Sequence, residues 1–223
     1  MPYLVKKPNP KPSIKSANAA GLVTFDQFYD LVEENVKADL LDGKIFRDSP
    51  AVPRHGQTCM WLSTLLTLYV QQFDLGEVNG GTTTVRLSAY QGPEPDIFFV
   101  RKSRLRIIGE KYVEAAPDIC IEVISKSSRK IDRGRKFVLY AEYSVREYWI
   151  IDPLRFTIEF YENQDGEWVE ILPDAEGRLH SKALVNFWLQ SRWFTSARPL
   201  PTAACAPMSM PPSRWSRRPR PTG

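Results

Sequence analysis

Two apolar segments of strand character, residues 94–100 and residues 117–125, each carry acidic side chains. Asp96 lies in the first segment and Glu122 in the second. A carboxylate in such a run is costly to bury unless a cation compensates its charge. A basic segment, residues 126–136, follows directly and supplies lysines and arginines. Acids and a lysine that converge in this way would suit a divalent-cation site that acts on phosphate esters.

The two strand segments are expected to pair as an antiparallel hairpin. About sixteen residues join residues 96–100 to residues 118–125, and a near-symmetric hairpin places Asp96 opposite residue 121, within one residue of Glu122. Asp118 shares a strand face with Glu122 but lies about 13 Å from it, at about 3.3 Å per residue. Those two carboxylates therefore cannot bind one ion, whereas Asp96 and Glu122 can.

The positive partner of these acids comes from the segment after the second strand. A helix is predicted over residues 132–143, and on it Lys136 shares one face with Asp132. If this helix packs back on the sheet, Lys136 reaches the carboxylates. Lys126 lies only two residues past the strand and needs no folding back. The spacing leaves the choice between the two lysines open.

The elements that must position these residues follow from hydrophobic periodicity. Thr24 and Gln27 form a capping-box pattern at the start of a first helix that ends near Lys37. A second helix is predicted over residues 54–73 and opens after Pro53. The predicted strands cover Val78, residues 83–87, 97–100, 119–124 and 147–152, and a hairpin of residues 156–161 and 168–172; residues 184–194 form a last apolar piece. Strands and helices together predict an α/β (α+β) fold.

Length and charge indicate one soluble domain over residues 23–194 of the 223-residue chain. This part holds 21 basic and 26 acidic residues, so the net charge of +4 comes from the two ends. Residues 1–22 are predicted to be a flexible basic arm, and residues 195–223 a disordered tail rich in proline and arginine. The N-terminus has no apolar signal core, and the longest apolar stretch, residues 60–70, is too short to span a bilayer. A cytoplasmic location is therefore expected.

The order of these motifs resembles the large bacterial family of putative restriction endonucleases, in the PD-(D/E)XK nuclease superfamily. The resemblance covers about residues 24–194. It rests on Pro117-Asp118, Glu122-Val123-Ile124-Ser125, Asp132-Arg133-Gly134-Arg135-Lys136, Tyr140-Ala141 and Glu147-Tyr148-Trp149-Ile150-Ile151-Asp152-Pro153, with Arg54-His55-Gly56 and Glu94-Pro95-Asp96 upstream.

The resemblance implies a mixed central β-sheet flanked by helices, with a metal-dependent phosphodiesterase site. Asp96 and Glu122 would hold Mg²⁺, or Mn²⁺, and Lys136 would replace the lysine that the superfamily carries two residues after the strand acid, where this chain has Ile124. A metal-activated water would then hydrolyse DNA, with the lysine orienting that water or stabilising the transition state. The alternative is a catalytically silent protein of the same fold that binds nucleic acid or a protein partner.

Several further residues are expected around this site. Asp118 would accept hydrogen bonds behind it or fix a loop, and His55 would support it, contact a phosphate or simply cap a helix. The basic run is the candidate DNA-contact patch, although such runs are usually only solvated; its members are Arg129, Lys130, Arg133 and Arg135. A homodimer would supply the two sites that double-strand cleavage needs.

Overall fold

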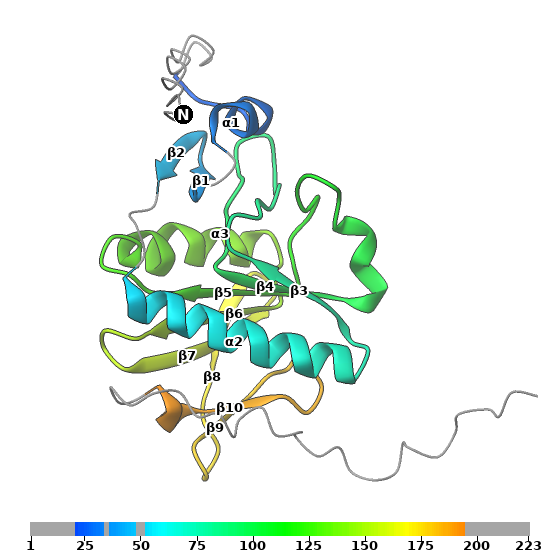
Figure 1. Ribbon diagram of the computed structural model, residues 1–223, viewed down its shortest axis with the longest axis vertical. Helices are drawn as coiled ribbons and strands as arrows, with labels where there is room; N and C mark the ends of the chain where they lie inside the picture. Colours follow the sequence, from blue (N-terminus) through cyan, green and yellow to red (C-terminus); the bar gives the residue numbers. More distant parts are fainter. Residues whose placement is uncertain (1–20, 34–35, 48–51, 195–223) are drawn as a thin grey trace, which may run out of the picture.

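A six-stranded mixed sheet with the strand order β3-β4-β5-β6-β7-β8 forms the centre of the fold (Figure 1). The structure is a computed structural model that describes residues 21–33, 36–47 and 52–194. The strands of the sheet are β3 (Gly76–Gly80), β4 (Ile97–Arg101), β5 (Ile119–Val123), β6 (Glu147–Asp152), β7 (Thr157–Gln164) and β8 (Glu167–Ile171). Only β5 and β6 pair in parallel; the other neighbours are antiparallel.

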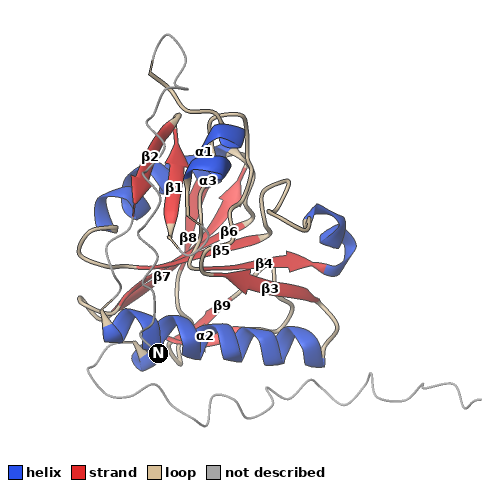
Figure 2. Cartoon of the chain, turned by 45° about the horizontal axis from the view of Figure 1, so that its top comes forward, coloured by secondary structure: helices blue, strands red, loops and turns tan. Residues whose placement is uncertain are grey.

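Helices cover both faces of this sheet (Figure 2). The long helix α2 (Pro53–Gln72) packs its leucines against one face, where Ile119, Ile121 and Val123 of β5 point. The crossover between β5 and β6 lies on the other face and consists of a π-helical turn, η2 (Ile131–Lys136), continued by α3 (Phe137–Glu142). Because side chains alternate along a strand, Glu122 points to the face of η2 and α3.

Smaller elements extend both layers. Helix α1 (Phe25–Leu31) lies at the end of the molecule near α3 (Figure 1). The hairpin of β1 (Ala38–Leu41) and β2 (Lys44–Arg47) lies at the same end. The hairpin of β9 (Arg178–His180) and β10 (Trp188–Gln190), followed by the short helix η3 (Ser191–Trp193), packs on the α2 side. The short 3₁₀ helix η1 (Lys102–Ile107) follows β4. No helix in the described ranges is long and apolar enough to cross a membrane.

Most of the predicted core elements are confirmed. The helix over residues 54–73, the strands of the sheet and the hairpin around residues 164–166 are present, as is the capping box of Thr24 and Gln27. The predicted fold class, an α+β fold with a mixed central sheet and a C-terminal hairpin, is therefore confirmed.

Four details of the prediction were wrong. The first helix ends at Leu31, not near residue 37, and residues 83–87 form a single isolated bridge, at Val85, instead of a strand. The short strands β1 and β9 had no alternating pattern to predict them. The pairing of β4 with β5 is shifted by one residue, since Ile97 lies opposite Ile121. The proposed tail, and the arm apart from its last two residues, lie outside the described residues.

Candidate active site

Strand β5 places Glu122 in a buried polar cluster between the sheet and α3. One carboxylate oxygen, Oε1, accepts hydrogen bonds from Lys136 Nζ at 3.0 Å and from the Tyr140 hydroxyl at 3.0 Å. The other oxygen, Oε2, faces the backbone N–H of Asp96 at 3.4 Å. The observed strand register therefore brings Asp96 directly beside Glu122. The sequence predicted this pairing to within one residue.

Asp96 lies one residue before β4 and is fixed from several sides. Its Oδ2 accepts a hydrogen bond from the backbone N–H of Val123 at 2.8 Å and lies 3.2 Å from His55 Nε2. Its Oδ1 pairs with Lys37. The backbone is also held tightly, because a Cβ on Gly80 would lie 2.2 Å from the Asp96 carbonyl oxygen. Only glycine permits this close approach of β3.

Lys136 is almost fully buried and contacts three carboxylates. Its Nζ lies 2.9 Å from Asp39, 3.0 Å from Glu122 and 3.8 Å from Asp132. The π-helical turn of residues 131–136 presents both Asp132 and Lys136 to the cluster, a local irregularity that is frequent at functional sites. Lys136, not Lys126, is therefore the lysine beside Glu122.

Further hydrogen bonds join β1 to the residues before β4. Asp39 Oδ1 accepts a hydrogen bond from the Glu94 backbone N–H at 2.7 Å. The Glu94 carboxylate in turn accepts hydrogen bonds from the Thr84 hydroxyl at 2.7 Å and from the Ala38 N–H at 3.0 Å. Asp39 and Lys37 were not predicted, because β1 is too short to show a period. The apolar run Ala38-Asp39-Leu40-Leu41 with one acid inside it was the available signal.

The electrostatics of the two central carboxyls differ. Burial raises the pKa of Glu122 well above its usual range, and the charge of Lys136 offsets this only in part. Burial acts in the same direction on Asp96, but the charge of Lys37 and the contact with His55 outweigh it, so the pKa of Asp96 lies well below its usual range. Burial opposes the charge of Lys136, yet its carboxylate neighbours, Asp39 first, raise its pKa well above the usual range. Lys136 thus stays protonated.

Acidic groups outnumber the lysines in this cluster. Five linked carboxylates face two lysines, and within the described residues the buried Oδ2 of Asp132 has no hydrogen-bond partner. Burial also raises the pKa of Asp132 to about 6 and that of Glu94 to about 7. The cluster therefore favours added positive charge, from protons or from a cation.

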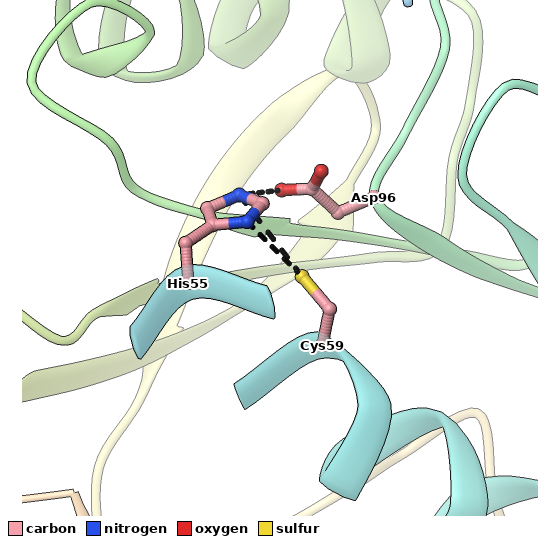
Figure 3. Close-up of side chains that lie close together, drawn as sticks. All are labelled: His55, Cys59 and Asp96. Carbon is pink, nitrogen blue, oxygen red and sulfur yellow. Dashed lines mark hydrogen bonds and ion pairs between the residues drawn. The ribbon is translucent and has the colours of Figure 1, made fainter. Parts of the chain in front are cut away.

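The other predicted residues lie around this cluster or apart from it. Asp118 is completely buried and pairs with Arg101 at 2.8 Å and Arg104 at 3.2 Å. These contacts tie the residue before β5 to the end of β4 and to η1, away from Glu122. Lys126 is exposed. His55, by contrast, contacts Asp96 directly and also approaches Cys59 on the next turn of α2 (Figure 3).

The basic run is only partly available to a ligand. Arg129 pairs with Asp152, Arg133 makes a two-point contact with Glu159 at 2.8 and 2.6 Å, and Arg135 lies 3.2 Å from Asp42. Lys130 is exposed and lines a cavity of about 500 Å³ with Arg135 and Gly134. The predicted phosphate contacts of this run stay predictions.

Comparison with known proteins agrees with the fold. A family model named Uma2, whose description is "Putative restriction endonuclease", matches residues 25–192. The chain belongs to this family. The match spans every residue of the cluster, from Lys37 to Lys136, so the resemblance read from the motifs is confirmed.

Two further proteins are similar to this chain, one in sequence and one in structure. An uncharacterized protein of Synechocystis sp. is 26% identical over 155 residues, which make up 66% of this chain and 78% of that protein. The crystal structure of a "putative nuclease belonging to DUF820" from Anabaena variabilis is similar with a TM-score of 0.65 and 17% identity, over 78% of this chain and 97% of the other. At this identity the structural likeness shows the fold alone.

Proposed function

We propose that this member of the Uma2 family is a Mg²⁺-dependent endonuclease that hydrolyses phosphodiester bonds of DNA. The observation that supports this most is the meeting of Asp96 and Glu122 on neighbouring strands, inside a cluster with more acids than lysines. Carboxylate oxygens are the donors that Mg²⁺ prefers. The family description, a restriction endonuclease, agrees with a hydrolase that acts on nucleic acid.

The carboxylate oxygens present fit such a cation. Lys136 and Tyr140 occupy Oε1 of Glu122, and Lys37 occupies Oδ1 of Asp96. The other two oxygens accept hydrogen bonds from backbone N–H groups across the strand pair: Glu122 Oε2 from Asp96 at 3.4 Å and Asp96 Oδ2 from Val123 at 2.8 Å, with Oδ2 also 3.2 Å from His55 Nε2. Asp96 and Glu122 would thus hold Mg²⁺, which when bound polarises a phosphate oxygen and lowers the pKa of a coordinated water.

The roles of the neighbouring side chains follow from their contacts. Lys136 fixes the orientation of Glu122, and because its pKa is raised it cannot act as a general base at neutral pH. Its contacts with Asp39 and Glu122 instead keep a positive charge beside the acid pair, where it would stabilise negative charge that develops nearby. Tyr140 holds Glu122 from the same side, and the Val123 N–H fixes Asp96.

One observation favours a second candidate, a catalytically silent protein that binds a partner through this fold. Three arginines of the basic run pair with acids of the same chain. They would have to exchange these partners for phosphates before they could bind DNA. A non-catalytic role needs no such exchange.

A cleavage assay separates the two candidates. The purified chain should nick plasmid DNA with Mg²⁺ or Mn²⁺ and not with EDTA. Asp96→Asn and Glu122→Gln keep the shape of each side chain but remove its charge, and each should reduce the rate at least about 10²-fold, as the loss of one charge-stabilising group does. Unchanged cleavage in both variants would exclude this site, and a wild-type protein that binds no Mg²⁺ and cuts neither DNA nor RNA would support the silent candidate.

A further inference from the structure

An imidazole, a thiol and a carboxylate, three groups that can bind zinc-like ions, meet at the start of α2. His55 and Cys59 lie four residues apart, on one face of the helix; the His55 ring points toward Asp96, and Cys59 Sγ points toward the His55 ring (Figure 3). His55 Nε2 lies 3.2 Å from Asp96 Oδ2 and 4.0 Å from Cys59 Sγ. One ligand atom from each residue lies within 4.8 Å of the other two.

These distances are close to those of a tetrahedral zinc site. Zinc lies about 2.3 Å from a thiolate and about 2.0–2.2 Å from imidazole nitrogen or carboxylate oxygen, so neighbouring ligand atoms are separated by roughly 3.3–3.6 Å. The nitrogen–oxygen pair already matches this separation, and the nitrogen–sulfur pair needs to close by about 0.4 Å. The sulfur–oxygen pair, Cys59 Sγ and the Asp96 carboxylate, lies within 4.8 Å, so the half-buried Cys59 side chain must also move toward Asp96 for both to reach one ion.

The charges and supports of the three residues also suit a divalent cation. A thiolate and a carboxylate together balance the charge of Zn²⁺, while the neutral imidazole adds none. The Val123 N–H holds Asp96 Oδ2 in position at 2.8 Å, which prepares the carboxylate for a ligand. Lys37 contacts the other oxygen, Oδ1.

We infer that His55, Cys59 and Asp96 form a binding site for a thiophilic divalent cation of the Zn²⁺ class, distinct from the hard-oxygen pair of Asp96 and Glu122. A thiolate ligand selects zinc-like ions over magnesium. Three protein ligands leave the fourth position of a tetrahedral ion open. Because Asp96 belongs to both sets, the two cations compete for its carboxylate. This last consequence rests on the proposed function: Zn²⁺ would inhibit the Mg²⁺-dependent cleavage.

Cobalt substitution tests the site without any activity assay. The full chain is titrated with Co²⁺ alone, without oxygen. Cys205 is replaced by serine so that this further cysteine cannot bind cobalt. We expect one equivalent to bind with a near-ultraviolet thiolate-to-cobalt charge-transfer band and the strong visible absorption of a four-coordinate ion, and Zn²⁺ to bleach both. Cys59→Ser should remove the charge-transfer band, while Cys59→His should keep four-coordinate binding without that band. His55→Ala should weaken binding at least about tenfold.

Glu122→Gln is the variant that separates this proposal from the proposed function. It leaves the three ligands intact, so the cobalt spectrum should persist even though cleavage and Mg²⁺ binding are lost. Three outcomes would each overturn the assignment. The protein with Cys59 intact could show no charge-transfer band, the band could survive Cys59→Ser, or it could be lost in Glu122→Gln. Failure of DNA cleavage with a normal cobalt spectrum would refute the nuclease proposal alone.

Discussion

Replacement of the buried lysine of the cluster gives the most specific prediction about stability. In the Lys136→Met variant the long apolar stem is kept, so packing changes little, but one positive charge leaves a site with three carboxylates at 2.9, 3.0 and 3.8 Å. Removal of one partner of a buried ion pair costs about 3–5 kcal/mol. The cluster can instead take up one proton to restore its charge.

The cost of that proton depends on pH and sets the expected magnitude. Protonation of one carboxyl with an ordinary pKa of about 4.3 costs about 1.4 kcal/mol per pH unit, or about 3.7 kcal/mol at pH 7 and about 1 kcal/mol at pH 5. Lys136→Met should therefore lower the free energy of unfolding by about 3–4 kcal/mol at pH 7 and by about 1 kcal/mol at pH 5. At pH 7 this corresponds to a decrease in Tm of about 6–16 °C.

Urea unfolding of both proteins at the two pH values, with EDTA present, measures this difference. Lys126→Met is the matched control, because its exposed side chain predicts a change within about 0.5 kcal/mol. A loss below about 1 kcal/mol at pH 7, or a loss that is the same at pH 5 and pH 7, would refute the view that Lys136 compensates buried carboxylates.

Two further predictions concern the rim of the cluster and the basic run. Burial raises the pKa of Glu94 from 4.5 to about 7. Between these pH values the folded state keeps a proton that the unfolded chain has lost. The free energy of unfolding should therefore fall as pH rises through this window, on the order of 3 kcal/mol in total. Glu94→Gln should remove this part of the pH dependence in urea unfolding without divalent cations; an unchanged slope between pH 5 and pH 7.5 would contradict it. Lys130→Ala should weaken DNA binding and reduce the salt slope of log K by about 1 if the exposed lysine contacts one phosphate; a slope equal to that of the wild type would remove Lys130 from the interface.

The pairing of the central strands could be predicted from the sequence because it depends on long, regular signals. The apolar runs of strand character at residues 97–100 and 119–124, together with a symmetric hairpin, were enough to bring Asp96 beside Glu122. The one-residue error in register arises because the connection contains the helix η1 and several bridges, whose lengths no periodicity reveals. The pair stayed together because the shift of one residue moves the partner of Asp96 from residue 121 toward Glu122.

The rest of the cluster could not be predicted, for a physical reason. Asp39 lies in the four-residue strand β1, and Lys37 comes directly before it. Both reach the site only through the tertiary packing of β1 on the residues before β4. Local propensity carries no information on such a contact. Cys59 lies in an apolar helical run, where a cysteine is expected to be a core residue, and its approach to His55 appears only when the helix face is known.

The most direct test of the central claim is the position of a bound Mn²⁺ ion. Crystals soaked in MnCl₂ and measured near the manganese absorption edge should show one anomalous peak between the strands, within about 2.4 Å of a carboxylate oxygen of both Asp96 and Glu122. A peak that contacts neither carboxylate, or no peak at all at saturating Mn²⁺, would contradict the proposal that this acid pair holds the catalytic cation.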